Sequence, residues 1–377
     1  MNTLRPFLPA LLCLFAMSSA RADLLVSDYH RNSVLRYNET NGAFVSTFIA
    51  ANAGGLIQPH GLAEGPDGNL YVASVGNDAV LRFNGTNGAF IDTFIASGSG
   101  GLDYPVWLEF RRDGFLYVSS QLNNSVLRYN ATNGAFADAF VTNASGGLNG
   151  PSGMTWGNDG HLYVVGRTGN QLLKYDGTNG AFLSALGTSP ILAQPFGVAV
   201  GPDGHLYVAN GNSNTVVRFD GQTGNHLGVF ATPPDPQMFP ISFPVGLGFG
   251  PDGSLYVANV NGSLLCRYHG ASGVFQSIFV AVASGGLSQP TFFLFRPART
   301  YGTNIANLGP IGPIEQRHIT RVLTEGPAAD ANGHIYFSDV QGQTIYCSGG
   351  RVHPGPPPGR PLCAGWFCRS ATKPTPW

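Results

Sequence analysis

The sequence predicts an all-β protein, a six-bladed β-propeller of four-stranded antiparallel blades, and three observations support this prediction. A tyrosine in a repeated "LYV" segment recurs every 44 to 49 residues, counted from Leu25 in the matching "LLV". A period in the forties that holds only strand-like patterns is typical of propeller blades. Glycine is abundant, with 52 of 377 residues, and charged residues make up only 11%. The tyrosine markers are Tyr71, Tyr117, Tyr163, Tyr207 and Tyr256.

Residues 61–95 show the four strands of one unit in order. The first is the short apolar run "GLAEG", and the second is "LYVAS", whose alternation places Leu70 and Val72 on the face opposite Tyr71. The third is "AVLRF" and the fourth is "AFIDTFI". Asp-Gly joins the first strand to the second, and Asn-Gly joins the third to the fourth. Both dipeptides suit the positive φ angles of tight hairpins.

The first unit lacks its own first strand, because the chain reaches "LLVSD" directly after the N-terminal segment. The missing strand is predicted downstream. Residues 284–297 read "SGGLSQPTFFLFRP" and match "AGGLIQPHGLAEGP" at residues 53–66, yet no "LYV" strand follows. We therefore expect Thr291 to Phe295 to pair with Leu24 to Asp28, so that a strand near residues 290–297 closes the ring. Closure removes exposed strand edges that invite aggregation.

The N-terminal residues predict a signal peptide, residues 1–22. A basic start, an apolar run and the final "ARA" indicate cleavage after Ala22 and a secreted or periplasmic protein. The apolar run is too short to span a bilayer, and no transmembrane segment is expected in the mature chain. The formal net charge is −1. Nucleic acid and anionic membranes are therefore not expected as partners, because both need clustered basic residues.

The predicted propeller occupies residues 23–297, and two further segments follow it. Residues 298–349 form one segment, and residues 350–377 form a tail rich in proline and cysteine that we expect to be disordered. The pairing of the three C-terminal cysteines, Cys347, Cys363 and Cys368, cannot be read from their spacing. Cys266 takes the strand position that Leu81 holds in another unit, which predicts a buried thiol.

The innermost strand of each blade begins at a proline, and the residue after it should face the channel mouth. A hard divalent cation would need several oxygen ligands at this ring. The ring offers one imidazole, two hydroxyls and three apolar groups, so neither a metal nor another cofactor is expected there. Its residues are His60, Val106, Ser152, Phe196, Val245 and Thr291.

The loops on this face are the expected binding surface, since loops on a rigid scaffold commonly carry recognition residues. The longest predicted loop runs from Ala231 to Phe243. Within it, Pro236, Met238 and Phe239 are the first-choice contacts with a partner, either a protein or a carbohydrate. A binding or recognition scaffold is therefore the function that the sequence favours.

Two resemblances accompany this interpretation. "GPDGNLYVASVGNDAVLRF" and its copies resemble NHL repeats over residues 23–297, which implies a six-bladed propeller that recognises a partner. Residues Leu323 to Tyr346, "LTEGPAADANGHIYFSDVQGQTIY", resemble the opening blade of the gluconolactonase and regucalcin family. That family implies the alternative function, lactone hydrolysis with a divalent metal such as calcium, and makes Glu325 a metal ligand.

The second resemblance supplies one ligand of several, because no further blades follow Tyr346. Two explanations remain open. The segment is either an extra strand pair beside the ring or the start of a lactonase domain whose reading frame was lost. In either case an enzyme of this kind would be degenerate or truncated in this chain.

Overall fold

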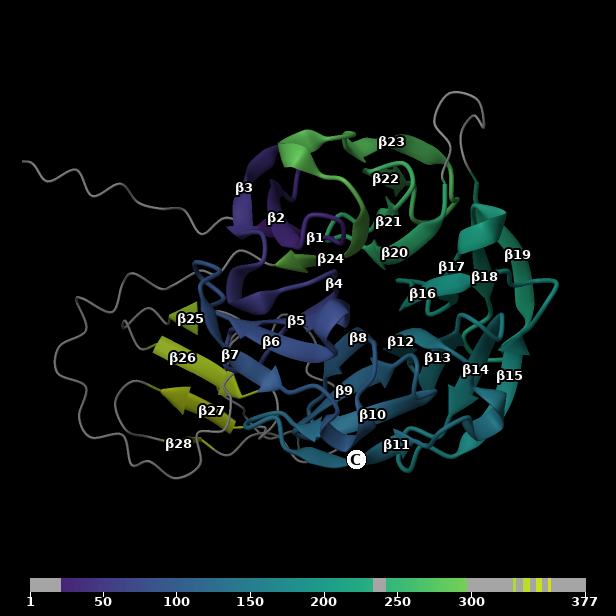
Figure 1. The fold of residues 1–377 in the computed structure, drawn as a ribbon, viewed down its shortest axis with the longest axis horizontal. Coiled ribbons are helices and arrows are strands. Elements are labelled where there is room, and N and C mark those ends of the chain that lie inside the picture. Colours follow the sequence, from purple (N-terminus) through teal and green to yellow (C-terminus); the bar gives the residue numbers. More distant parts are fainter. Residues whose placement is uncertain are drawn as a thin grey trace, which may run out of the picture. The chain divides into compact units, whose positions relative to one another are not determined.

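The structure is a computed structural model, and it describes residues 22–232, residues 242–296 and four short strands between residues 328 and 353. The chain divides into two units, Met1–Tyr301 and Gly302–Trp377. In the first unit, six four-stranded antiparallel sheets surround a common axis (Figure 1). The predicted fold, a closed six-bladed propeller, is confirmed.

The blades are numbered here from the one that holds both ends of the ring, and their strands are given from the axis outward. Blade 1 consists of β24 (Pro290–Arg296), β1 (Asp23–Asp28), β2 (Ser33–Asn38) and β3 (Phe44–Ile49). Blade 2 consists of β4 (Pro59–Glu64), β5 (Leu70–Ser74), β6 (Ala79–Phe83) and β7 (Phe90–Ile95). Blade 3 consists of β8 (Pro105–Phe110), β9 (Phe115–Ser120), β10 (Ser125–Asn130) and β11 (Phe136–Val141).

The second half of the ring repeats this order. Blade 4 consists of β12 (Pro151–Trp156), β13 (Leu162–Gly166), β14 (Gln171–Tyr175) and β15 (Phe182–Gly187). Blade 5 consists of β16 (Pro195–Val200), β17 (Leu206–Asn210), β18 (Thr215–Phe219) and β19 (His226–Ala231). Blade 6 consists of β20 (Pro244–Phe249), β21 (Leu255–Asn259), β22 (Leu264–Tyr268) and β23 (Phe275–Val280).

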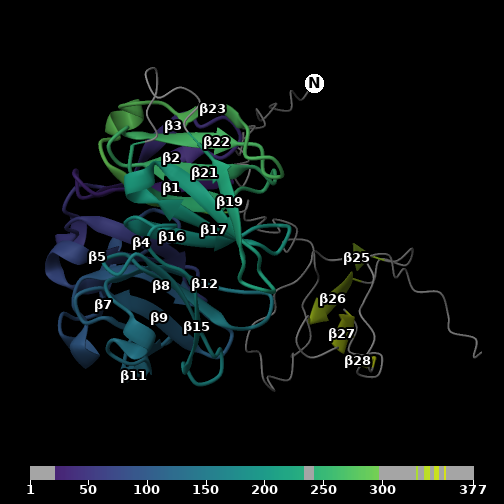
Figure 2. The same ribbon diagram turned by 90° about the vertical axis from the view of Figure 1, so that its right-hand side faces the viewer.

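Short 3-10 turns occur between strands. They are η1 (Ala53–Gly55), η2 (Val75–Asn77), η3 (Ser99–Gly101), η4 (Ser145–Gly147), η5 (Gly211–Ser213) and η6 (Ser284–Gly286). The inner strands β4 and β16 lie near the middle of the propeller in two perpendicular views (Figure 1 and Figure 2). We call the face at which the six inner strands begin the mouth face. It contains the turns between second and third strands and the loops that lead from one blade to the next.

The ring is closed by the predicted strand. β24 pairs antiparallel with β1, from Asp23 opposite Arg296 to Asp28 opposite Pro290. The fully buried Asp28 carboxylate accepts backbone N–H groups of Ser288 and Gln289 at 3.0 and 3.3 Å. The first and last strands of the ring are thus joined by both a ladder and a buried side chain.

The hydrophobic core lies between neighbouring blades. Tyr71 of β5 is 1% exposed, and its ring meets Phe94 of its own blade and Phe110 of the next in edge contacts at 4.8 and 4.7 Å. Tyr207 makes the same contacts with Phe230 and Phe249. The repeated tyrosine therefore joins adjacent sheets, because strand alternation directs it toward the next blade.

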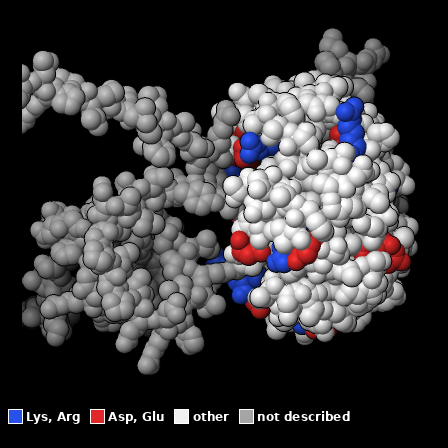
Figure 3. All heavy atoms as spheres, turned by 60° about the vertical axis from the view of Figure 1, so that its left-hand side comes forward, with Lys and Arg blue, Asp and Glu red and all other residues white. Residues whose placement is uncertain are grey.

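The repeated basic residue of the third strand has a structural role. Arg82 pairs with Asp92 of the neighbouring strand and with Asp67 in the Asp-Gly turn, and the Asp67 carboxylate also accepts the hydroxyl proton of Tyr71 at 3.0 Å. Lys174 pairs with Asp159 at 2.8 Å in blade 4. Figure 3 shows one side of the propeller, where charged groups form isolated spots on a largely uncharged surface.

The second unit contains one described four-stranded antiparallel sheet. Its strands are β25 (Ala328–Ala329), β26 (Ile335–Asp339), β27 (Thr344–Cys347) and β28 (Val352–His353). The sheet thus has four strands rather than a single strand pair. β28 belongs to the segment that was expected to be disordered. Within the described residues, no helix is long and apolar enough to cross a membrane.

Several predicted features lie outside the described residues. They are the signal peptide through Arg21, the loop residues Pro236, Met238 and Phe239, Glu325, Cys363 and Cys368.

Candidate functional site

The residues that follow the six prolines all lie at the start of inner strands on the mouth face. Val106, Phe196 and Val245 form one buried cluster with Phe292, which lies two residues after Pro290. These side chains come from blades 3, 5, 6 and 1, so the cluster spans the ring axis. The axis is therefore filled by apolar groups at this end.

The two hydroxyls of the predicted ring bind neighbouring backbone. Ser152 is fully buried and donates to the carbonyl oxygen of Phe196 at 2.7 Å, and Thr291 donates to that of Pro59 at 2.9 Å. Each bond joins the inner strands of adjacent blades. Each hydroxyl can still accept a further hydrogen bond, but its one proton is used to join the inner strands of adjacent blades.

Glycines allow the inner strands to approach closely. A Cβ atom at Gly197 of β16 would lie 2.5 Å from the carbonyl oxygen of Val245, and one at Gly246 of β20 would lie 2.4 Å from that of Thr291. Any larger residue would push neighbouring strands apart. This close approach draws the inner strands of blades 5, 6 and 1 together at the mouth face.

His60 lies in an aromatic environment near the axis. Its imidazole stacks on Phe196 at 5.7 Å and meets Tyr29, Tyr104 and Phe292 at 5.2, 6.2 and 6.0 Å. The residue is 5% exposed, and its Nδ1 atom has no hydrogen-bond partner among the described residues. Burial, with the nearby positive charge of Arg167, lowers the pKa of His60 to about 3, so the imidazole is neutral near pH 7.

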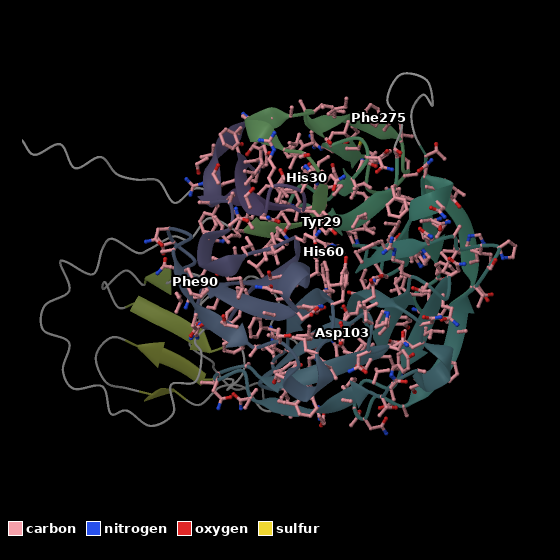
Figure 4. The ribbon with its side chains drawn as sticks, in the orientation of Figure 1. Tyr29, His30, His60, Phe90, Asp103 and Phe275 are labelled. Carbon is pink, nitrogen blue, oxygen red and sulfur yellow. The ribbon has the colours of Figure 1, made fainter. Side chains whose placement is uncertain are left out.

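Two further residues complete this group, Arg167 from blade 4 and Phe243 from blade 6. The guanidinium carbon of Arg167 lies 4.8 Å from the ring centre of Phe196 and 5.8 Å from that of Phe243. Tyr29 and His60 lie close together near the axis in Figure 4. We define the mouth cluster as Tyr29, His60, Tyr104, Arg167, Phe196 and Phe243, which come from blades 1 to 6 in that order.

The backbone that positions Tyr104 and Phe243 is left-handed. Both residues precede the proline of an inner strand, with φ of 55° and 60°, a region that bulky side chains rarely adopt. The N–H of Tyr104 donates to the Asp78 carboxylate at 2.8 Å, and that of Phe243 donates to the side-chain oxygen of Asn214 at 2.9 Å. Each bond comes from the preceding blade and fixes the loop that carries the aromatic ring.

The mouth cluster carries one formal positive charge at neutral pH. Burial lowers the pKa of Arg167 from its ordinary value, although an arginine remains charged in proteins. Burial, together with the neighbouring Tyr29 hydroxyl, raises the pKa of Tyr104 to about 12, so this hydroxyl stays protonated. The cluster therefore presents a guanidinium and a protonated phenol beside aromatic rings.

Metal ligands do not gather at this site. Among the described residues, no group of three or more His, Cys, Asp and Glu side chains could hold a metal ion. His30 is exposed, whereas His60 is buried in the aromatic group. The imidazole, two hydroxyls and three apolar groups of the ring present no set of carboxylates, which calcium and magnesium prefer.

Two other features with ionisable groups lie outside the mouth cluster. Glu109 lies on inner strand β8, and burial raises its pKa to about 7, against the opposing effects of Trp107 and Arg111. A cavity of about 440 Å³ lies at the opposite face, between turns of blades 4 and 5. Its Asp159 and Asp220 carboxylates already bind Lys174 and backbone N–H groups.

Sequence reasoning found His60 and Phe196 but missed Tyr29, Tyr104, Arg167 and Phe243. Tyr104 and Phe243 occupy the position before the proline, and the other two lie in the turns after β1 and β13. The repeat register places all these positions on the mouth face. An alignment of the units at the residue before each proline would have revealed the two aromatic side chains.

Comparisons with known proteins agree with the fold. Residues 8–233 match the family described as "Lactonase, 7-bladed beta-propeller", although the ring described here has six blades. No curated protein matches the chain.

Solved structures that resemble this chain share little sequence with it. A Bacteroides caccae protein described as being of unknown function is 14% identical, with a TM-score of 0.57, and covers 74% of this chain and 99% of its own. A chain of a nidogen/laminin complex is 13% identical, with a TM-score of 0.58, covering 72% and 97%. Virginiamycin B lyase from Staphylococcus aureus is 15% identical, with a TM-score of 0.49, covering 80% and 85%. At these identities the likeness concerns the fold alone.

Proposed function

This chain belongs to the lactonase family of β-propellers, and from that premise we propose that it is an exported recognition scaffold that binds a ligand or partner at its mouth face. One observation carries the proposal: each of the six blades contributes one residue to the mouth cluster. Partly exposed rings and a guanidinium form a recognition surface above a buried apolar base. The resemblance to NHL repeats supports the same function, since such propellers are mostly binding platforms.

The proposal extends to the predicted loop from Ala231 to Phe243, which precedes β20 in the sequence. Met238 and Phe239 remain predicted partner contacts, because their sequence lies in the longest loop of this face. Replacing both with serine should abolish the capture of any partner that the native protein binds. An unchanged set of captured partners would remove this loop from the binding surface.

A thermal-shift screen of small organic molecules tests recognition at the mouth. We expect at least one compound to raise the melting temperature of the native protein and of Gln222→Ala, a variant at the opposite face. The same compound should not stabilise Tyr104→Asn, because asparagine tolerates the left-handed backbone but lacks the ring. An equal shift in Tyr104→Asn, or no stabilising compound at all, would contradict the proposal.

Lactone hydrolysis is the second candidate, and what supports it is the description of the family that matches residues 8–233. In this case Glu325 would bind a divalent metal such as calcium, as the resemblance of residues 323–346 implies. Hydrolysis of a panel of sugar and aromatic lactones, with and without calcium, zinc or manganese, distinguishes the two functions. Metal-dependent hydrolysis that is lost in Glu325→Gln would replace the scaffold proposal with the enzymatic one.

A further inference from the structure

Arg167 differs from the arginines of the third strands in its surroundings. Arg82 and Arg128 pair with Asp92 and Asp138 of the neighbouring strands. The Arg167 guanidinium forms no ion pair with an acidic residue in the described part of the chain, and it lies against the rings of Phe196 and Phe243. A desolvated guanidinium in this position would be stabilised by a carboxylate that accepts hydrogen bonds from two of its parallel N–H groups.

Two acidic residues of the mouth face are already engaged. The Asp78 carboxylate accepts the backbone N–H of Tyr104, and the Asp28 carboxylate accepts those of Ser288 and Gln289. Each carboxylate is held in place by the backbone N–H groups that donate to it. Neither is committed to the guanidinium of Arg167, which is left to bind an external anion.

The surroundings of Arg167 select the charge of that anion. His60 is a second basic group in contact with the Phe196 ring, and its burial holds it neutral. Its unpaired Nδ1 atom shows that a buried polar group of the cluster is left without a protein partner among the described residues. One positive charge matches a monoanion, whereas a second negative charge on the ligand would remain uncompensated in a partly buried site.

The rings select the body of the ligand. Tyr29, Tyr104 and Phe243 are partly exposed around Arg167, above buried Phe196 and Phe292. Aromatic side chains favour offset or edge contacts with another flat ring. The phenolic hydroxyl of Tyr104 remains protonated and hydrogen-bonds with that of Tyr29. A bound carboxylate would take this proton in place of Tyr29.

We propose that the mouth cluster binds a singly charged carboxylate attached to a flat apolar body, with the carboxylate on Arg167 and the body against Tyr104 and Phe243. This inference rests on the proposed recognition function and names the chemistry of its ligand. It requires no metal ion, because the guanidinium and the phenol supply the contacts to the anion. A neutral analogue of the same shape lacks the negative charge. The positive charge of Arg167 would therefore stay unpaired when that analogue binds.

Calorimetric titration with trans-cinnamate, its neutral amide and inorganic phosphate tests the inference. The native protein should bind cinnamate about tenfold or more tightly than the amide, because a charged hydrogen-bonded pair is lost. Arg167→Gln should weaken cinnamate by a similar factor. Arg167→Lys should be intermediate, since it keeps the charge without the planar pair of donors. The matched control Arg218→Gln alters an arginine of β18 that is not part of the mouth cluster, and it should bind like the native protein.

Equal binding of cinnamate and its amide would overturn the inference, as would undiminished binding in Arg167→Gln or a preference for phosphate. No binding of cinnamate would overturn it as well. If Arg167→Gln does not fold, Arg167→Lys and the comparison with the amide decide the outcome. A ligand of other chemistry that stabilises the native protein but not Tyr104→Asn would leave the recognition function standing and remove only the carboxylate inference.

Discussion

The imidazole of His60 stacks on the ring of Phe196, with ring centres 5.7 Å apart and planes inclined by 19°. His60 is the second residue of the inner strand of blade 2 and Phe196 is the second residue of that of blade 5, so the contact crosses the ring axis. It forms because the inner strands approach closely and because both side chains follow a proline in the same register. The stack joins opposite blades at the place where we propose that a ligand binds.

The closing strand makes the ring dependent on its last residues. A chain ending at Val282 lacks β24 and the bonds from Thr291 to Pro59 and from Ser288 to Asp28. It should aggregate or lose its cooperative thermal transition, because β1 is left with an open edge. A chain ending at Arg299 should melt like the full-length protein, as followed by circular dichroism and light scattering. Equal behaviour of the two truncated chains would contradict the role of closure.

The lowered pKa of His60 predicts that the protein loses stability in acid. Its pKa of about 3 in the folded protein lies below the ordinary value of 6.5, so the unfolded chain takes up the proton first. Stability therefore falls as the pH decreases from 6.5 toward 3, by about 2 kcal/mol at pH 5 from this group. Arg167 faces the imidazole and opposes its protonation, while the Tyr104 hydroxyl stays neutral.

Urea unfolding of the native protein and of His60→Phe at pH 7.5 and pH 5 measures this effect. The variant keeps an aromatic ring at the position, so it should lose less of its unfolding free energy between the two pH values. An identical loss in both proteins would show that His60 does not remain neutral in the folded state.

The raised pKa of Glu109 predicts the opposite dependence of stability on pH. Burial raises its pKa to about 7, above the ordinary value of 4.5, so the folded protein retains a proton that the unfolded chain has already released. The contribution to stability is present at low pH and is lost as the pH rises through 7. Glu109→Gln should therefore be more stable than the native protein at pH 8, by about 1–3 kcal/mol, and this advantage should shrink at pH 5. A constant difference in unfolding free energy between pH 5 and pH 8 would contradict the raised pKa.

Asp78 fixes the left-handed loop that carries Tyr104. Asp78→Ala removes the acceptor of the Tyr104 N–H and places alanine at a φ of 51°, where asparagine and aspartate are better tolerated. The unfolding free energy should fall by about 1–3 kcal/mol. Asp78→Asn keeps an oxygen acceptor and should lie close to the native protein. Equal stabilities of Asp78→Ala and Asp78→Asn would show that this bond does not hold the loop.

The sequence was sufficient to predict the blades because the same hairpin dipeptides recur at fixed positions. Each Asp-Gly and Asn-Gly pair defines a turn, and the alternation around Tyr71 and its counterparts defines the faces. The closing strand could be located because residues 284–297 repeat the start of another unit. Local chemistry and register were enough for these features.

The mouth cluster could not be predicted in the same way. The directions of Tyr104 and Phe243 depend on a positive φ that their residue types disfavour and that Asp78 and Asn214 impose from the preceding blade. The partners of Arg167 come from blades 5 and 6, far along the chain. The hydroxyls of Ser152 and Thr291 were counted as groups of the mouth ring, but their bonds to neighbouring strands depend on the spacing between blades.

A crystal structure of the protein with trans-cinnamate would show directly whether the mouth cluster binds a carboxylate. We expect the carboxylate on the guanidinium of Arg167, the cinnamate ring against Tyr104 and Phe243, and no coordinated ion nearby. Cinnamate bound elsewhere while the mouth cluster stays empty would contradict this expectation. A metal ion coordinated among His60, Ser152 and Thr291 would contradict it as well.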